Sequence, residues 1–327
     1  MPGDGDIPAG GSWHTPVPDP RSSIPGPQYA WLFPGQGSQS VGMGKALYNA
    51  HSEVRALYDA ADRALGYPIS GLCFNGPTDT LQQTNHAQPA LLVTELAHLQ
   101  ALKLRPGWDP RPPLFVAGHS LGEYAALVAA GALQFTDALN LVAERGRLMQ
   151  QAGSVGGPTG MAAVIGLDDA ALDEVCREAG VDIANLNAPG QVVISGPLDA
   201  VEAASVLAKQ RGARRVVPLQ VSAAFHSRWM RPMSEHLAQA IAATPITDPS
   251  LPVVANVTAR PVASATEIRQ LLAAQTYSPV RWIESVQYMA SKGVDTFIEI
   301  GPGKVLTGLV KRIVPEAQAQ ASEDLLA

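Results

Sequence analysis

The stretch Gly118-His119-Ser120-Leu121-Gly122 is the most informative part of the sequence, because it places a hydroxyl group between two glycines, after an apolar run and before a helix-forming one. Residues 114–117 before it form an apolar run typical of a buried strand, and residues 123–130 after it favour a helix that ends at Gly131. A serine on such a sharp strand-to-helix turn points its Oγ outward, beside the positive end of the helix. The five-residue pattern also occurs by chance in loops, but its two flanks predict that Ser120 is a nucleophile.

Strand and helix patterns alternate around this turn, which indicates α/β layers with a mainly parallel sheet. An apolar strand at 29–33 runs into a Gly-rich turn at 34–39, the kind of turn that lets a ligand approach the backbone. Helices are expected near 45–65, 90–104, 137–151, 229–243, 281–291 and up to Val314, and further strands at 252–255 and 296–300. We therefore predict a large α/β-hydrolase-like domain made of residues 29–155 and 223–327.

The predicted strands and helices become shorter between residues 156 and 222, where six of them follow one another. Strand patterns at 161–165, 181–184, 191–194 and 214–219 enclose helix patterns at 168–179 and 198–211. The resulting order βαββαβ is ferredoxin-like and predicts a small subdomain inserted into the large one. Residues 1–28 are rich in Pro and Gly and show no apolar periodicity, so we expect a flexible extension without chemistry.

Composition excludes several classes of protein. Apolar residues make up 46% of the 327 residues and charged residues 16%, as in a compact globular chain, and a net charge of −6 argues against general binding to nucleic acid or anionic membranes. The two cysteines, Cys73 and Cys176, lie far apart without metal-ligand spacing, so neither a disulfide scaffold nor a metal site is expected. With no signal peptide or membrane span predicted, we expect a cytoplasmic protein.

A serine nucleophile needs a neighbouring base, and His226 is the best placed of seven histidines. It lies at the return from the small subdomain into the large domain, where clefts form. From the residues alone, a structural histidine at this position is an equal alternative to a base. The remaining histidines are interpreted as part of the extension (His14), as helix surface or packing residues (His51, His98, His236), as a loop residue (His86), and as a donor of a supporting hydrogen bond (His119).

Many ordered segments carry a resemblance that covers nearly all of the chain after the extension. They are residues 33–39, 88–90, 118–124, 145–146, 187–196, 225–226, 277–280 and 301–306. In these segments the chain resembles the malonyl-CoA:acyl carrier protein transacylases, including the discrete acyltransferases of trans-acyltransferase polyketide synthesis. The resemblance implies that Ser120 accepts a malonyl group from malonyl-CoA, with His226 as the base, and passes it to the phosphopantetheine thiol of a carrier protein.

The same resemblance assigns further site residues. Backbone N–H groups of Gln36 and Leu121 would hold the oxyanion, and a main-chain carbonyl near Gln275 would orient His226, which makes a Ser-His dyad. Arg145 would hold the malonyl carboxylate through paired hydrogen bonds, so acetyl transfer should be poor.

The acyl pocket is assigned by the same resemblance. Phe225 would crowd an α-methyl group, which favours malonyl over methylmalonyl units, although Ala223 stands where family members carry a histidine. Gln88 and Met149 match positions that line the acyl pocket, with packing as the alternative role.

The resemblance also implies an acidic carrier protein as partner, a monomeric enzyme and no bound cofactor. Docking on a basic surface and ordinary solvated charge are equal alternatives for six basic residues, namely Arg211, Arg214, Arg215, Lys304, Lys311 and Arg312. Two other functions compete with acyl transfer. A proofreading acyl hydrolase of the same fold would also need Ser120 and His226, but would gain nothing from Arg145. A carrier-docking module with a dead active site would not need an intact Ser, His and Arg set.

Overall fold

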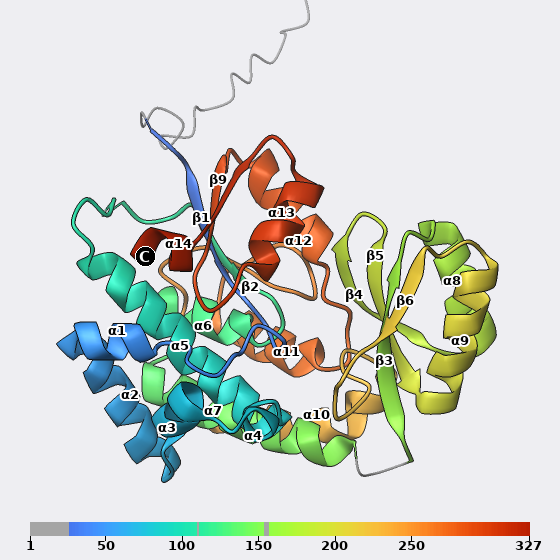
Figure 1. Ribbon diagram of the computed structural model, residues 1–327, viewed down its shortest axis with the longest axis horizontal. Helices are drawn as coiled ribbons and strands as arrows, with labels where there is room; N and C mark the ends of the chain where they lie inside the picture. The colour runs from blue at the N-terminus through green and yellow to red at the C-terminus, as the bar shows by residue number, and fades with distance from the viewer. Residues whose placement is uncertain (1–25, 110, 154–156) are drawn as a thin grey trace, which may run out of the picture.

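The computed structural model describes residues 26–109, 111–153 and 157–327 (Figure 1). Within these ranges the main sheet has six strands, in the order β10-β9-β1-β2-β7-β8. The strands are β1 (Tyr29–Phe33), β2 (Phe115–Gly118), β7 (Val253–Val254), β8 (Pro261–Val262), β9 (Thr296–Glu299) and β10 (Gln318–Ala321). Neighbouring strands from β10 to β7 are parallel and only the β7–β8 pair is antiparallel. The predicted mainly parallel α/β sheet is confirmed.

Strand β1 shows how the sheet is covered on both faces. Successive side chains of a strand point to opposite faces. Trp31 and Phe33 pack in a core with α5 (Thr84–Leu104), α6 (Gly122–Ala129) and α7 (Phe135–Ala152). Ala30 and Leu32 pack in a second core with α12 (Trp282–Ser291) and α13 (Val305–Ile313). The sheet therefore lies between two helical layers (Figure 1).

Several helices depart from the sequence prediction. The predicted helix 45–65 is two helices, α1 (Lys45–Ala50) and α2 (Ser52–Leu65), because His51 has an extended backbone. Helix α5 begins at Thr84 and contains Pro89, so His86 lies in a helix and not in the predicted loop. The predicted helix 229–243 is a short 3₁₀ helix, η1 (Arg228–Met230), followed by α10 (Arg231–Ala243). The sequence analysis did not predict strands β8 and β10 or the helices α3 (Ile69–Asn75), α4 (Thr78–Leu81), α11 (Ala265–Gln275) and α14 (Ser322–Leu326). Within the described ranges, none of the helices is both long and apolar enough to span a bilayer.

A second, antiparallel sheet forms the unit on the right of Figure 1. Its elements are β3 (Thr159–Ile165), α8 (Asp169–Ala179), β4 (Asp182–Ala188), β5 (Gln191–Pro197), α9 (Leu198–Gln210) and β6 (Arg215–Pro218). The strand order is β4-β5-β3-β6, and α8 and α9 share an apolar core with the sheet. The element order is the βαββαβ order predicted for residues 156–222, while the predicted boundary at 155/156 falls outside the described residues.

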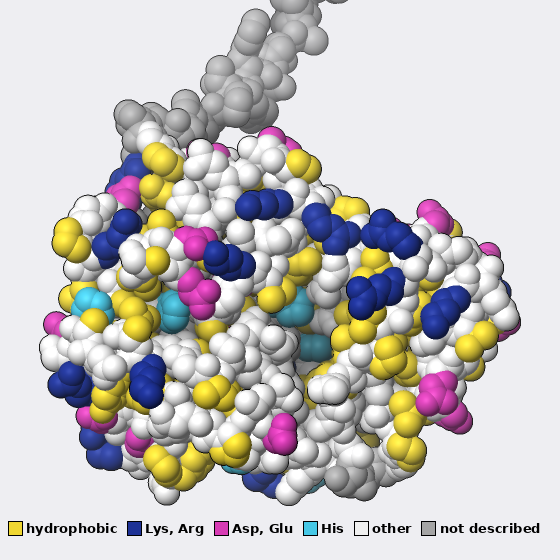
Figure 2. Space-filling view, viewed as in Figure 1, with side chains coloured by type: hydrophobic (Ala, Val, Ile, Leu, Met, Phe, Trp, Pro, Cys, Tyr) yellow, Lys and Arg dark blue, Asp and Glu magenta, His cyan; other side chains and the backbone are white. Residues whose placement is uncertain are grey.

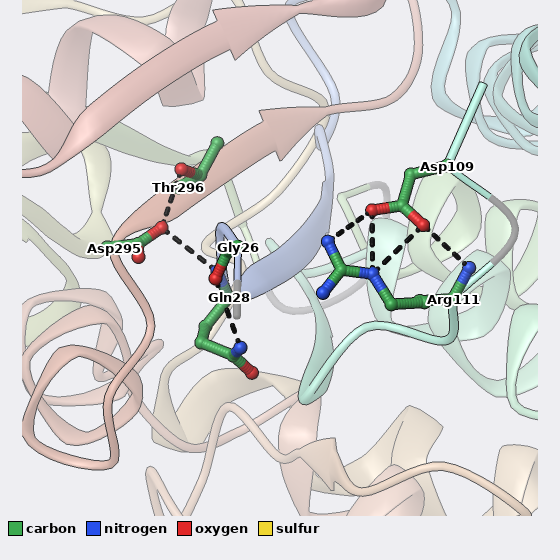
Figure 3. Close-up of polar contacts among 6 residues, drawn as sticks. All are labelled: Gly26, Gln28, Asp109, Arg111, Asp295 and Thr296. Atoms are coloured by element: carbon green, nitrogen blue, oxygen red, sulfur yellow. Dashed lines mark hydrogen bonds and ion pairs between the residues drawn. The ribbon is translucent and has the colours of Figure 1, made fainter. Parts of the chain in front are cut away.

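The start of the described chain is attached to the main sheet, as Figure 3 shows. The Gln28 N–H donates to Asp295 Oδ1 at 3.1 Å, and the Asp295 and Thr296 N–H groups donate to the Gln28 carbonyl at 3.1 and 3.2 Å. Nearby, Arg111 and Asp109 form an ion pair at 2.5 Å. The predicted extension therefore ends too late, because Gln28 already belongs to the fold. Residues 1–25 of that extension lie outside the described residues.

Candidate active site

The turn that carries Ser120 follows β2, next to the central strand β1. Ser120 has a φ of 53°, in the left-handed region that non-glycine residues rarely adopt. Both flanking glycines are sterically required: a Cβ atom on Gly118 would lie 1.8 Å from the Gly122 carbonyl carbon, and one on Gly122 would lie 2.1 Å from the Phe33 oxygen. The backbone thus presents the serine side chain at the carboxyl end of the sheet, as the flanks predict.

His226 lies within hydrogen-bond distance of this serine, although 105 residues separate the two in the sequence. Its Nε2 is 2.8 Å from Ser120 Oγ, and its Nδ1 is 2.8 Å from the main-chain carbonyl of Gln275. A carbonyl oxygen can only accept, so Nδ1 carries the proton and the Nε2 lone pair faces the serine hydroxyl. The imidazole is held in the orientation that a general base requires.

Burial keeps this imidazole neutral. The pKa of His226 is lowered to about 3, mainly by burial and further by the positive charge of Arg145. The side chain is only 4% exposed, and its backbone φ of 59° is again left-handed. At neutral pH the ring is therefore unprotonated and free to accept the serine proton.

Arg145 brings a buried positive charge to the same place from α7. Its Nη1 donates to Gln88 Oε1 at 2.6 Å, and its Nη2 donates to Gln275 Oε1 at 3.0 Å and to Ser120 Oγ at 3.2 Å. Its Nε has no hydrogen-bond partner among the residues that the structure describes. Two neutral amides thus hold the guanidinium beside the nucleophile, and neither neutralises it.

These side chains open into a cavity of about 320 Å³ between the two sheets. Figure 2 shows the hollow, with histidine side chains visible inside it. Among the predicted site residues, the lining includes Gln36, Ser120, Leu121, Arg145, Met149, Phe225 and His226. Gln88 was predicted to line the acyl pocket, but it is not part of the lining. Gln275, whose main-chain carbonyl was predicted to orient His226, does not line the cavity either. Their side chains are almost fully buried and accept hydrogen bonds from the Arg145 guanidinium.

Backbone N–H groups that border the cavity near Ser120 are candidates to bind an oxyanion. The Ser120 N–H already donates to Asn256 Oδ1 at 2.7 Å, so it is occupied. Gln36 follows β1 and Leu121 immediately precedes α6, and both residues border the cavity at Ser120. An N–H at the start of a helix lacks a partner within that helix and is available to an anion.

His119 has the supporting role that the sequence suggests. Its Nε2 lies 2.8 Å from Asn187 Oδ1 on β4, and its ring packs edge-on against Trp282. A second contact joins the two units, because Thr84 Oγ1 lies 2.9 Å from Ser222 Oγ. These bonds connect the small unit and the segment after β6 to the Ser120 turn and to α5.

Three polar features of the site were not predicted: the Asn256 side chain, the Glu123 carboxylate and the side chain of Gln275. Gln275 is the last residue of α11, a helix that the sequence analysis missed. A capping pattern could have revealed it, since Ser264 Oγ accepts the Glu267 N–H at 3.2 Å three residues later. Asn256 carries no comparable pattern.

The six basic residues proposed for docking differ in availability. Arg211 is paired with Glu178, and Lys304 with Asp324 at 2.6 Å. Arg312 donates to Gln191 and to the Pro189 carbonyl. Arg214, Arg215 and Lys311 are exposed. Figure 2 shows Lys and Arg side chains gathered beside the hollow, over the four-stranded sheet and α13.

Comparison with known proteins defines the class. The family model for the acyl transferase domain matches residues 30–327, so this chain belongs to the acyl transferase family. It is 49% identical to the malonyl CoA-acyl carrier protein transacylase of Bacillus subtilis, over 87% of this chain and 90% of that protein.

Solved structures agree with this assignment. The crystal structure of an acyl carrier protein S-malonyltransferase from Vibrio cholerae is 43% identical, with a TM-score of 0.87 over 92% of this chain and all of the other. A malonyl-transacylase solved in complex with its type II polyketide acyl-carrier protein is 42% identical, with a TM-score of 0.85 over 90% of this chain and 94% of the other.

Proposed function

We propose that this chain is a malonyl-CoA:acyl carrier protein transacylase that works through a malonyl ester on Ser120. The observation that carries the proposal is the convergence on one hydroxyl: Ser120 Oγ is 2.8 Å from the His226 imidazole and 3.2 Å from the Arg145 guanidinium. A base explains acyl transfer, and a buried cation explains the choice of an acyl group with a free carboxylate. The names of the relatives support the same reaction.

In the first half-reaction, Ser120 Oγ attacks the thioester carbonyl of malonyl-CoA while His226 Nε2 takes the hydroxyl proton. The carbonyl oxygen becomes an oxyanion, which the N–H groups of Gln36 and Leu121 stabilise; one such donor typically contributes about 3 kcal/mol. The C–S bond then breaks, and the imidazolium returns the proton to the departing CoA thiolate. The products are a malonyl ester on Ser120 and free CoA.

In the second half-reaction, the phosphopantetheine thiol of the carrier protein replaces CoA. His226 deprotonates the thiol, the thiolate attacks the ester, and the proton passes back to Ser120 Oγ as the C–O bond breaks. The sequence of steps is ping-pong and uses no bound cofactor or metal ion. We expect it to run in the cytoplasm, with a monomeric enzyme and a carrier of either fatty acid or polyketide synthesis.

Arg145 selects the acyl group in this scheme. The malonyl carboxylate replaces Ser120 Oγ as a partner of the guanidinium, and the unpartnered Nε offers a further donor. A neutral acetyl group offers the guanidinium no carboxylate, so it forgoes the charge-assisted hydrogen bonds that malonyl makes. The cavity-lining Phe225 ring disfavours an α-methyl group, so malonyl should be preferred over methylmalonyl by about 1 to 3 kcal/mol.

A proofreading acyl hydrolase remains the alternative within this family. It would use Ser120 and His226 but would have no need for a buried guanidinium beside the nucleophile. The position of Arg145 therefore favours transfer, and water should attack the malonyl ester slowly. Turnover of malonyl-CoA at the same rate with and without carrier protein would instead identify a hydrolase.

The test is the intact mass of the protein after mixing with malonyl-CoA. We expect the wild type to gain one malonyl group and Ser120→Ala to gain none, and added carrier protein to remove the group. When malonyl-, methylmalonyl- and acetyl-CoA compete, the malonyl adduct should dominate. Lack of an adduct on the wild type, or an adduct that persists in Ser120→Ala, would contradict the proposal.

A further inference from the structure

Glu123 is a buried carboxylate behind the nucleophile that the reaction above leaves unused. It is the second residue of α6 and is 3% exposed. Its Oε2 accepts two hydrogen bonds, from the Asn256 N–H at 3.1 Å and from the Gln275 side-chain amide at 2.8 Å. A carboxylate is costly to bury, so its two partners indicate what it does.

The first partner, Asn256, holds the turn that carries the nucleophile. Its Oδ1 accepts the Ser120 N–H at 2.7 Å, and its Nδ2 donates to the Gly118 carbonyl at 2.6 Å. One side chain therefore fixes both sides of the turn in which Ser120 adopts its left-handed conformation. Such a conformation persists only when its surroundings impose it.

The second partner, Gln275, contacts all three groups of the site. Its Nε2 donates to the Ser120 carbonyl at 3.0 Å as well as to Glu123, and its Oε1 accepts from Arg145. Its main-chain carbonyl accepts from His226 Nδ1. Displacement of Gln275 would thus move the nucleophile, the cation and the base together.

We propose that ionised Glu123 is a positioning residue, which acts through Asn256 and Gln275 to hold the Ser120 turn and to aim Arg145. It is not a catalytic residue, because its contacts are with the residues behind the cavity. The inference rests on the proposed function and deepens it. A charge-assisted hydrogen bond is about twice as strong as a neutral one, so the ionised carboxylate should hold both partners more firmly than a neutral group of the same shape.

The surroundings of Glu123 allow its ionisation to be observed separately. Its pKa is raised to about 7 by burial, against the opposing effects of Gln275, Asn256 and the Arg145 charge. Among the described residues, Arg145 and Tyr124 interact electrostatically with Glu123, and two histidines, His119 and His226, adjoin Ser120. Burial raises the pKa of Tyr124 to about 12 and lowers the pKa of His226 to about 3. Burial also lowers the pKa of His119 and the pKa of Arg145, and Arg145 remains a cation. Glu123 is charged above about pH 7, so its contribution should be present there and lost as the pH falls.

The experiment compares malonyl loading of the wild type with that of Glu123→Gln from about pH 5.5 to 8.5, read by intact mass. Glutamine keeps the size and one accepting oxygen but not the charge. We expect the ratio of the two values of kcat/KM to be about ten at pH 8 and to fall toward one below about pH 6. Titration of malonyl-CoA cancels in this ratio. A ratio that does not change with pH would indicate a merely structural role and would overturn the proposal.

Glu299→Gln is the matched control, because Glu299 is equally buried and its oxygens accept N–H bonds at the start of α13. Its ratio to the wild type should not vary with pH. If Glu123→Gln fails to fold, the wild type is compared with Gln275→Ala, which removes the link to Arg145. That ratio should also rise with pH through about 7, and a constant ratio again overturns the proposal. Absence of a malonyl ester on the wild type would contradict the proposed function instead.

Discussion

At the scale of single residues, the site combines strain and burial at the positions that carry the chemistry. Ser120 and His226 are two of the three described non-glycine residues with a positive φ. A hydrogen bond from the backbone holds each of them: the Ser120 N–H donates to Asn256 Oδ1, and the His226 N–H donates to the Thr276 carbonyl. Backbone strain of this kind costs about 1 to 3 kcal/mol per residue and is retained where it positions a reacting group.

Arg145 gives the prediction at this scale. Arg145→Ala should lower malonyl loading at least about a hundredfold, because the carboxylate loses a buried charged partner, while acetyl loading should not fall. The matched control is Arg147→Ala in the same helix, since Arg147 is exposed and paired with Glu144. It should load at the wild-type rate. Loading rates of both variants with malonyl- and acetyl-CoA decide the matter, and an equal loss for both substrates would argue against a carboxylate site.

At the scale of elements, strand β2, the Ser120 turn and helix α6 pack so closely that neither Gly118 nor Gly122 has room for a Cβ atom. Gly122 packs against the end of β1, where a Cβ atom would overlap the Phe33 carbonyl. The same contact holds α6 against the sheet and sets the direction in which Ser120 points. Packing of this element is therefore linked directly to the geometry of the site.

A pair of glycine substitutions tests this element. Gly122→Ala should destabilise the protein by more than about 3 kcal/mol or prevent folding, because backbone would have to move. Gly308→Ala, inside α13 with open space around the new Cβ, should stabilise it by about 0.4 to 1 kcal/mol. Thermal and denaturant unfolding measure both changes. Similar stabilities for the two variants would show that the contact between Gly122 and β1 is not restrictive.

At the scale of the whole molecule, the cavity exists because two separately built units meet. Bonds from His119 to Asn187 and from Thr84 to Ser222 connect the four-stranded unit to the nucleophile turn and to α5. The hollow that results is bordered by exposed basic side chains in a protein of net charge −6 (Figure 2). Local positive charge beside the cavity suits an acidic carrier protein, because opposite charges steer association.

Charge reversal tests this surface. The double variant Arg214→Glu with Arg215→Glu should weaken carrier binding about tenfold or more at low salt, and the difference should shrink as salt rises. Loading from malonyl-CoA should be unchanged in it. Arg63→Glu, on α2 at the opposite end of the molecule, is the control (Figure 1). Unchanged carrier affinity in the double variant would assign these arginines to ordinary solvated charge.

The sequence alone determined the parts of this protein that depend on local pattern. The nucleophile turn between its two glycines, the parallel α/β alternation and the order of the six elements around residues 159–218 are all readable, because each is specified by neighbouring residues. Helix α11 and the division of residues 45–65 at His51 were not predicted from the sequence. The periodicity of such a helix is weak and helix boundaries depend on packing, so local pattern does not specify them.

The contacts that hold the site together depend on tertiary packing. His226 reaches Ser120 across more than a hundred residues of chain, and Gln88 and Gln275 accept hydrogen bonds from Arg145 instead of lining the cavity. The roles of Asn256 and Glu123 depend on contacts between segments that no local pattern links. A hydrogen bond depends on where two groups lie in space, and for these residues that place is set by the packing of the sheet and its helices.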